Sequence, residues 1–288
     1  MSATELKASG HPQGHSTTRD STVGSDRRTL TLFFCVAYAL SWSIQIPLAL
    51  QSHGKLSTSL PYSLHYLSAF GPLASAFITA ALTEGRTGIR SLIRRMTKWR
   101  ISIGWWLVAF SPLFLYMLTA IIVSFLTATA PAGQALGKID FMPDLAWAAL
   151  PFWILTFGIG EETGWRGFAL PRLQRNHSAL RATLTLWILW TLWHLPLFFY
   201  SYEASILPGL AIGLLAGTIT FTWLYNSTGG SILILAIWHG SFNFVTACSV
   251  CKTGISSAVV STMVMIWALL IVVIYKPARL SNAEKQVD

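Results

Sequence analysis

Residues 257–275 read SAVVSTMVMIWALLIVVIY, a run without a single charged side chain. A membrane-spanning helix needs about 20 predominantly apolar residues, because each residue adds about 1.5 Å to its length. Seven further apolar runs of similar length precede this one, near residues 30–50, 61–82, 104–126, 145–170, 181–200, 206–226 and 229–248. The sequence therefore predicts an all-α protein: a polytopic transmembrane helix bundle of about eight spans.

The composition agrees with this prediction. Of the 288 residues, 53% are hydrophobic and 11% are charged, and the mean hydropathy is +0.55. Soluble domains carry roughly 25% charged residues. A soluble two-domain enzyme, a solenoid of repeats and a secretory signal peptide are therefore excluded as explanations of the apolar runs.

The basic residues lie between the apolar runs. There are 20 Lys and Arg residues against 11 Asp and Glu residues, and no basic stripe with interleaved aromatic residues supports nucleic-acid binding. With eight spans both termini lie on one side of the membrane, and all basic residues except Lys55, Lys138 and Lys252 fall on that side. By the positive-inside rule, both termini are expected to be cytoplasmic.

The polar segment 1–29 is expected to be a disordered N-terminal tail, because it holds too few apolar residues to offset the entropy of ordering. The transmembrane domain is expected over residues 30–276, with its functional motifs in 161–243, followed by a C-terminal tail, 277–288. The Ser-rich tail and the absence of an organelle signal favour a multi-pass protein of a bacterial plasma membrane.

Three glycines, Gly209, Gly213 and Gly217, repeat every four residues in the sixth predicted span. Such a stripe lies on one helix face and permits close approach of another helix. We expect the partner to be an adjacent helix of the same chain, with a second protomer as the alternative; the sequence does not specify the oligomeric state.

Ionisable side chains inside membrane spans are costly, so each needs a partner or a function. The polar residues of the predicted spans that call for such an explanation are Glu161, Glu162, Arg166, His194, His239 and Asn243. At about 1.5 Å per residue, Glu161, His194 and His239 lie roughly 15–20 Å below the cytoplasmic edge, near the middle of a hydrocarbon core of about 30 Å. Three helices therefore bring ionisable groups to one level, which predicts a buried functional site.

The spacing of these residues also predicts their local relations. Glu162 and Arg166 are four residues apart, so they share a helix face and can form an ion pair. Glu161 points about 100° away and has no partner nearby in sequence, as suits a carboxylate reserved for chemistry. Pro196 removes a helical hydrogen bond, so we expect the helix to bend or loosen near His194, with a simple packing kink as the alternative.

A carboxylate, two imidazoles and a carboxamide around a cavity can hydrolyse an amide bond without a nucleophilic serine or cysteine. The sequence contains neither Gly-x-Ser-x-Gly nor His-Glu-x-x-His. The residues alone leave two alternatives open, a proton- or ion-coupled transporter and a non-catalytic immunity or scaffold protein. They also leave open whether a proton, a histidinium or a cation balances the net negative charge of Glu161, Glu162 and Arg166.

The ordered set of motifs resembles a known family. Residues 161–166, Glu-Glu-Thr-Gly-Trp-Arg, are similar to the Glu-Glu-x-x-x-Arg motif of the CAAX-processing and bacteriocin-processing (CPBP or Abi) family of intramembrane endopeptidases, which includes the type II CAAX prenyl proteases. Residues 190–194 resemble its Phe-x-x-x-His motif and residues 239–243 its His-x-x-x-Asn motif. One departure is that Trp190 stands where the family usually has Phe, which keeps an aromatic wall and adds an indole N–H.

The resemblance implies an intramembrane endopeptidase that acts on membrane-associated or lipidated substrates. By the same resemblance, Glu161 would activate the attacking water and His194 would help to position it. His239 and Asn243 would stabilise the oxyanion. Glu162, Arg166 and Trp190 would support the site.

The resemblance leaves open whether a metal ion takes part in the reaction. Glu161, His194 and His239 form a possible zinc ligand set with an open position for water. Asn is a poor zinc ligand, however, and members of the family are described both as metalloproteases and as metal-independent glutamate proteases. We favour the water-only glutamate mechanism. The expected partners are a peptide or lipidated protein substrate and the lipid bilayer, without nucleic acid.

Overall fold

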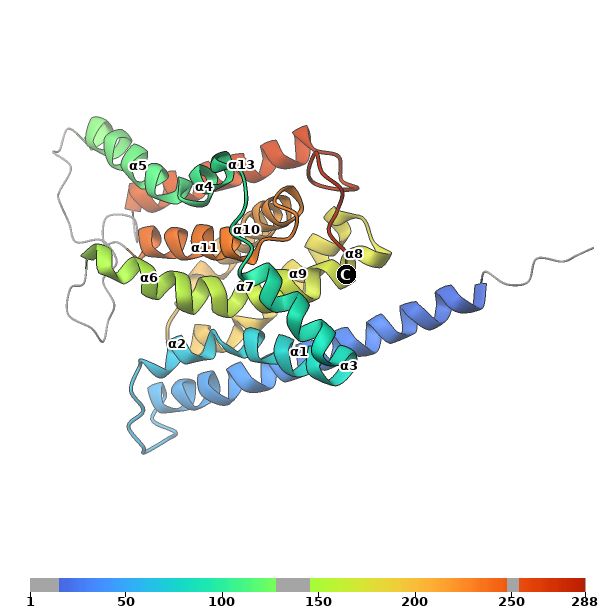
Figure 1. Ribbon diagram of the computed structural model, residues 1–288. Helices are drawn as coiled ribbons and strands as arrows, with labels where there is room; N and C mark the ends of the chain where they lie inside the picture. The colour runs from blue at the N-terminus through green and yellow to red at the C-terminus, as the bar shows by residue number, and fades with distance from the viewer. Residues whose placement is uncertain (1–15, 128–145, 248–253, 288) are drawn as a thin grey trace, which may run out of the picture.

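The computed structural model describes residues 16–127, 146–247 and 254–287 of the chain. In these residues every regular element is a helix, and the helices form one bundle (Figure 1). The predicted all-α class is therefore confirmed.

Each of the eight predicted spans corresponds to helical structure. The first half of the described chain contains α1 (Ser16–Ser52), α2 (Leu64–Ser68), α3 (Gly71–Met96), α4 (Ile103–Ala109) and α5 (Ser111–Thr127). A nearly continuous helical run follows, with η1 (Ala146–Ala148), α6 (Ala149–Trp153), η2 (Ile154–Ile159), α7 (Gly160–Gly164), η3 (Trp165–Ala169) and α8 (Leu170–Asn176). The remainder consists of α9 (Ala179–Trp193), η4 (Leu195–Phe199), η5 (Ala204–Ile206), α10 (Leu207–Ser227), α11 (Ile232–Thr246) and α13 (Gly254–Ile274).

Fewer than eight helices of the described residues meet the length and composition expected of a membrane span. Five helices of the described residues are long and apolar enough to cross a membrane, or six if the bent pair α4 and α5 forms one span. The run from η1 to α8 is broken into short pieces and carries buried charges, and α11 has only 15 residues. The predicted count of eight is therefore not confirmed, and the cytoplasmic orientation of the termini stays a prediction.

The run from α6 to α8 passes through the middle of the bundle (Figure 1). On one side α3 packs against both α1 and α7, and on the other α11 packs against η2 and α6. Helix α10 contacts α9 and α13. The central run, which carries the predicted carboxylates, is thereby shielded on both sides by apolar helices.

Glycines allow the central run to approach its neighbours closely. A Cβ atom added at Gly164 would lie 2.5 Å from the backbone oxygen of Pro72, and one at Gly158 would overlap the backbone of Ala236. The predicted stripe on α10 behaves differently, because a Cβ at Gly209 or Gly213 would meet nothing within 4 Å. The expected close contact with a helix of the same chain is therefore wrong at these two positions, which lie at the periphery of the described bundle.

Parts of both predicted tails lie within the described residues. Helix α1 begins at Ser16, inside the segment predicted to be a disordered tail, and residues 1–15 of that segment lie outside the described residues. In the predicted C-terminal tail, Leu280 is fully buried and Lys285 donates to the backbone oxygen of His177 at 2.9 Å. The segment after α13 therefore folds back onto the start of α9.

Candidate active site

The two adjacent glutamates lie on α7, between two wide helical turns. Both η2 and η3 are π-helical, a rare geometry that occurs often at functional sites. A wide turn disturbs the usual backbone pairing, and here Arg95 from α3 donates to the backbone oxygen of Gly167 in η3 at 2.7 Å. The predicted helix over 145–170 is thus present, but its two π-helical turns have no signal in the hydrophobic pattern.

Glu162 and Arg166 form the predicted ion pair. Both side chains are fully buried, and Nη1 of Arg166 lies 3.0 Å from Oε1 of Glu162. The same carboxylate oxygen lies 2.8 Å from Nδ1 of His239. Because an unpaired charge is costly in a medium without water, these groups stabilise one another in the bundle.

Residues of α9 and α10 complete the surroundings of Arg166. Its guanidinium lies 4.3 Å from the ring of Trp190 and 4.4 Å from the ring of Phe221, and its Nη2 donates to Thr218 at 3.3 Å. Thr218 and Phe221 were not predicted as site residues from the sequence. Their only sequence signal is a spacing of three residues, which places them on one helix face, and many apolar helices share it.

Glu161 has a hydrogen-bond partner that is distant in sequence. The carboxylate is 2% exposed, and its Oε2 accepts a hydrogen bond of 2.8 Å from the indole Nε1 of Trp190. Phe at this position would have no such donor. The residue that departs from the family motif therefore contacts the carboxylate directly.

His194 lies where α9 ends and the 3-10 helix η4 begins, so the predicted loosening before Pro196 is confirmed. Its Nδ1 lies 2.7 Å from the backbone oxygen of Trp190. A carbonyl oxygen can only accept a hydrogen bond, so Nδ1 must carry the proton. In the neutral ring this leaves Nε2 as an acceptor.

The predicted site residues surround Trp190. Its ring centroid lies 5.4 Å from that of His194 and 5.9 Å from that of His239. Asn243 follows His239 by one turn of α11 and is partly buried. Its carboxamide makes no hydrogen bond to the described part of the chain. The structure thus brings Glu161, Glu162, Arg166, His194 and His239 into one buried cluster and places Asn243 on the helix that carries its second histidine.

The possible zinc ligands are not gathered into a metal site. Within residues 16–127, 146–247 and 254–287, no three His, Cys, Asp or Glu side chains come together closely enough to hold a metal ion. The ring of Trp190 contacts both imidazoles. The donor set as folded does not fit a zinc centre.

The fold and the cluster define the class of protein: a helical integral membrane protein with a buried Glu–Arg–His cluster near the middle of its bundle. Residues 143–245 match the family described as type II CAAX prenyl endopeptidase Rce1-like. The chain is also similar to CAAX prenyl protease 2 of Methanococcus maripaludis, with 30% identity over 145 residues. That alignment covers 46% of this chain and 54% of the relative, so the chain spans about half the length of the curated relative that it matches.

The family match covers residues 161–243, which carry the three motifs, and both comparisons agree with the resemblance drawn from them. This segment is similar to the type II CAAX prenyl endopeptidase family.

Proposed function

We propose that this protein is an intramembrane endopeptidase that hydrolyses peptide bonds of membrane-associated substrates. The observation that carries the proposal is the buried carboxylate of Glu161, which Trp190 orients beside two histidines. A carboxylate held in this way is suited to general-base chemistry, because one oxygen is fixed by a donor and the other is left to accept a proton.

In the proposed reaction Glu161 removes a proton from a water molecule, whose oxygen attacks the carbonyl carbon of the scissile bond. Nε2 of His194 accepts a hydrogen bond from the same water and fixes its direction. The tetrahedral intermediate then breaks its C–N bond, and Glu161 returns the proton to the departing amine. Each turnover consumes one water and leaves the side chains unchanged.

His239 and Asn243 are proposed to stabilise the oxyanion. Nδ1 of His239 donates to Glu162, so Nε2 can donate to an oxyanion only when the ring is an imidazolium. An imidazolium with Arg166 balances the charges of Glu161 and Glu162, which leaves the buried site neutral. The carboxamide of Asn243 supplies a second donor. A positioned donor of this kind contributes about 10²–10³ to kcat.

The proposed substrates are prenylated proteins with a CAAX C-terminus. This proposal draws on the matching family, a type II CAAX prenyl endopeptidase, and on the similar relative, a CAAX prenyl protease. It is also consistent with a site enclosed by helices that face lipid, because a lipidated C-terminus is already anchored at the membrane.

The test is cleavage of quenched fluorescent peptides by the full chain in detergent, with products identified by mass spectrometry. A farnesylated CAAX peptide, its unprenylated counterpart and a scrambled sequence are compared, each with and without a chelator. We expect cleavage of the farnesylated peptide within the CAAX sequence and no loss of rate with the chelator. A rate that disappears with the chelator and returns with zinc would contradict the water-only mechanism.

A further inference from the structure

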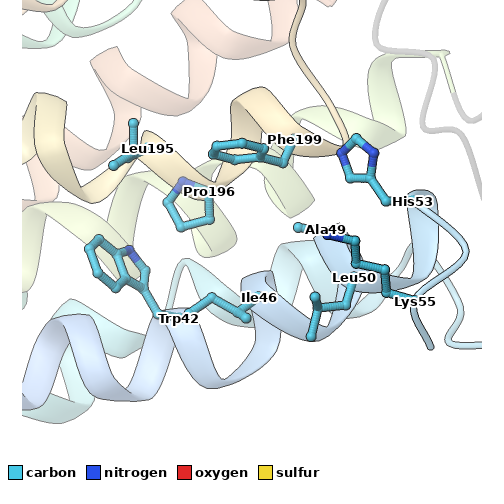
Figure 2. A pocket seen from close by; sticks show the side chains of 9 residues that line it. All are labelled: Trp42, Ile46, Ala49, Leu50, His53, Lys55, Leu195, Pro196 and Phe199. Atoms are coloured by element: carbon cyan, nitrogen blue, oxygen red, sulfur yellow. The ribbon is translucent and has the colours of Figure 1, made fainter.

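An apolar crevice lies between α1 and η4. It has a volume of about 330 Å³, which falls at the small end of the roughly 300–1,000 Å³ typical of ligand sites. The residues that line it, labelled in Figure 2, include Trp42, Ile46 and Leu50 of α1 and Leu195, Pro196 and Phe199 of η4. No residue of the Glu–Arg–His cluster lines this crevice.

Much of the apolar lining is exposed. Ile46 is 44% exposed, Leu50 40% and Phe199 54%. Both walls belong to helices that are long and apolar enough to cross a membrane, so these side chains face the hydrocarbon of the bilayer. A hydrocarbon chain is the chemical group that such walls accommodate.

One end of the crevice is basic. His53 and Lys55 line it just after the end of α1, at the right of Figure 2. Gly54 has a φ of +66°, and the backbone N–H of Lys55 returns to the oxygen of Leu50 at 2.8 Å, so the turn folds Lys55 back toward the apolar walls. No acidic residue lines the crevice. The lining therefore presents positive charge beside a hydrocarbon-sized channel, at the level where a span ends.

We propose that the crevice binds one acyl chain of an anionic phospholipid, whose phosphate is held by Lys55 with His53 beside it. The acyl chain of a zwitterionic lipid would occupy the same crevice. Its choline group, however, would offset the negative charge of the phosphate that Lys55 binds. A basic residue near a membrane surface favours anionic lipid by ~1 kcal/mol, which corresponds to about fivefold in occupancy.

A lipid in this place would brace the segment that follows His194. Trp42 of α1 donates to the backbone oxygen of Trp193 at 3.1 Å, and Ser52 donates to that of Phe199 at 2.8 Å. These two bonds span η4, and the crevice lies between them. An acyl chain there would fill the gap between α1 and η4 along the length of that short helix.

The test is native mass spectrometry of the full chain equilibrated with phosphatidylglycerol or phosphatidylcholine of identical acyl chains. We expect one retained phosphatidylglycerol, at about fivefold higher occupancy than phosphatidylcholine. Lys55→Gln should bring the two lipids to equal occupancy. The matched control is Lys276→Gln, which removes an exposed charge beyond α13 and should leave the preference unchanged.

A second pair of variants tests the walls. Ile46→Trp places a large side chain in the crevice. Because position 46 is exposed and not in the core, the variant should still fold, while retention of both lipids falls. Val273 of α13 is 73% exposed and does not line the crevice, so Val273→Trp should leave lipid retention unchanged. Equal effects of Lys55→Gln and Lys276→Gln, or undiminished retention in Ile46→Trp, would overturn the proposal. Displacement of the phosphatidylglycerol by a farnesylated peptide would also overturn it, because the crevice would then belong to the substrate.

Discussion

Glu161 and Glu162 are neighbours in sequence but lie in different surroundings. Glu162 is held by two cationic or ionisable partners, Arg166 and His239, at 3.0 and 2.8 Å. Glu161 has a single neutral donor, the indole of Trp190. The first arrangement stabilises a buried charge, and the second orients a carboxylate while leaving one oxygen for chemistry. This difference supports the proposed roles of Glu162 as structural support and of Glu161 as the base.

Replacing Glu162 should destabilise the protein strongly. In Glu162→Gln the buried guanidinium of Arg166 loses its ionic partner, which costs about 3–5 kcal/mol. Glu161→Gln is the control, because its amide oxygen can still accept the hydrogen bond of Trp190. Thermal unfolding in detergent should show a large fall in midpoint for the first variant and a small one for the second. Equal midpoints would contradict the assignment.

Removing the indole donor should slow catalysis without disturbing the fold. Trp190→Phe keeps an aromatic ring against Arg166 but loses the hydrogen bond to Glu161, and hydrogen bonds to charged groups contribute about 1.5–3 kcal/mol. We expect kcat to fall about 10- to 100-fold with little change in KM. Steady-state kinetics on a peptide substrate measures this.

The control for that variant lies one turn away. Trp193 is also buried, and its indole N–H has no hydrogen-bond partner in the described part of the chain. Trp193→Phe should therefore leave kcat nearly unchanged. If the two substitutions lowered kcat equally, the indole hydrogen bond to Glu161 would have no part in catalysis.

At the scale of the elements, the central helix depends on close contact with α3. Gly164→Ala would place a methyl group 2.5 Å from the backbone oxygen of Pro72, and backbone cannot move aside cheaply. We expect a loss of about 1–3 kcal/mol in the free energy of unfolding. Gly213→Ala meets nothing within 4 Å and should be neutral or stabilise α10 by up to about 1 kcal/mol. A stable Gly164→Ala variant would contradict the packing described for α7.

The sequence predicted those features that depend on residues close together in the chain. The helical segments follow from apolar runs, the Glu162–Arg166 pair from a spacing of four, and the loosening at His194 from Pro196. It could not predict the bond from Trp190 to Glu161, because the packing of α9 against the central run decides that contact.

The same limit explains the errors at the level of helices. A glycine stripe shows that close contact is sterically allowed, but not that a neighbour is there. A Cβ atom at Gly209 or Gly213 would meet no described residue within 4 Å. The count of eight spans is not confirmed, because apolar character alone does not distinguish a spanning helix from a short or broken one such as α11 or η2.

At the scale of the whole molecule, α1 and the segment after α13 both contact the corner between α8 and α9. Asp26 of α1 pairs with Arg175 at the end of α8. In the segment that follows α13 in the sequence, the backbone oxygens of Pro277 and Ala278 accept hydrogen bonds from the first residues of α9, each at 3.0 Å. The helix that leads to His194 is thus anchored at its start by the C-terminal segment.

Leu280 should be the main apolar contact of that segment. It is fully buried, so Leu280→Ala should cost about 2–5 kcal/mol. The adjacent Arg279 is exposed and pairs with the exposed Glu284, so Arg279→Ala should cost no more than about 1 kcal/mol. Chemical denaturation followed by tryptophan fluorescence compares the two. Equal losses would show that the C-terminal segment is not docked as described.

The most direct test of the central claim is the initial rate of cleavage of a farnesylated CAAX peptide by the wild-type chain and by Glu161→Gln in identical proteoliposomes. Both proteins should have similar thermal midpoints, because the hydrogen bond of Trp190 is kept. General-base catalysis contributes about 10²–10⁴ to the rate, so we predict a loss of at least 10² in the variant. Cleavage by Glu161→Gln at the wild-type rate would show that this carboxylate is not the base.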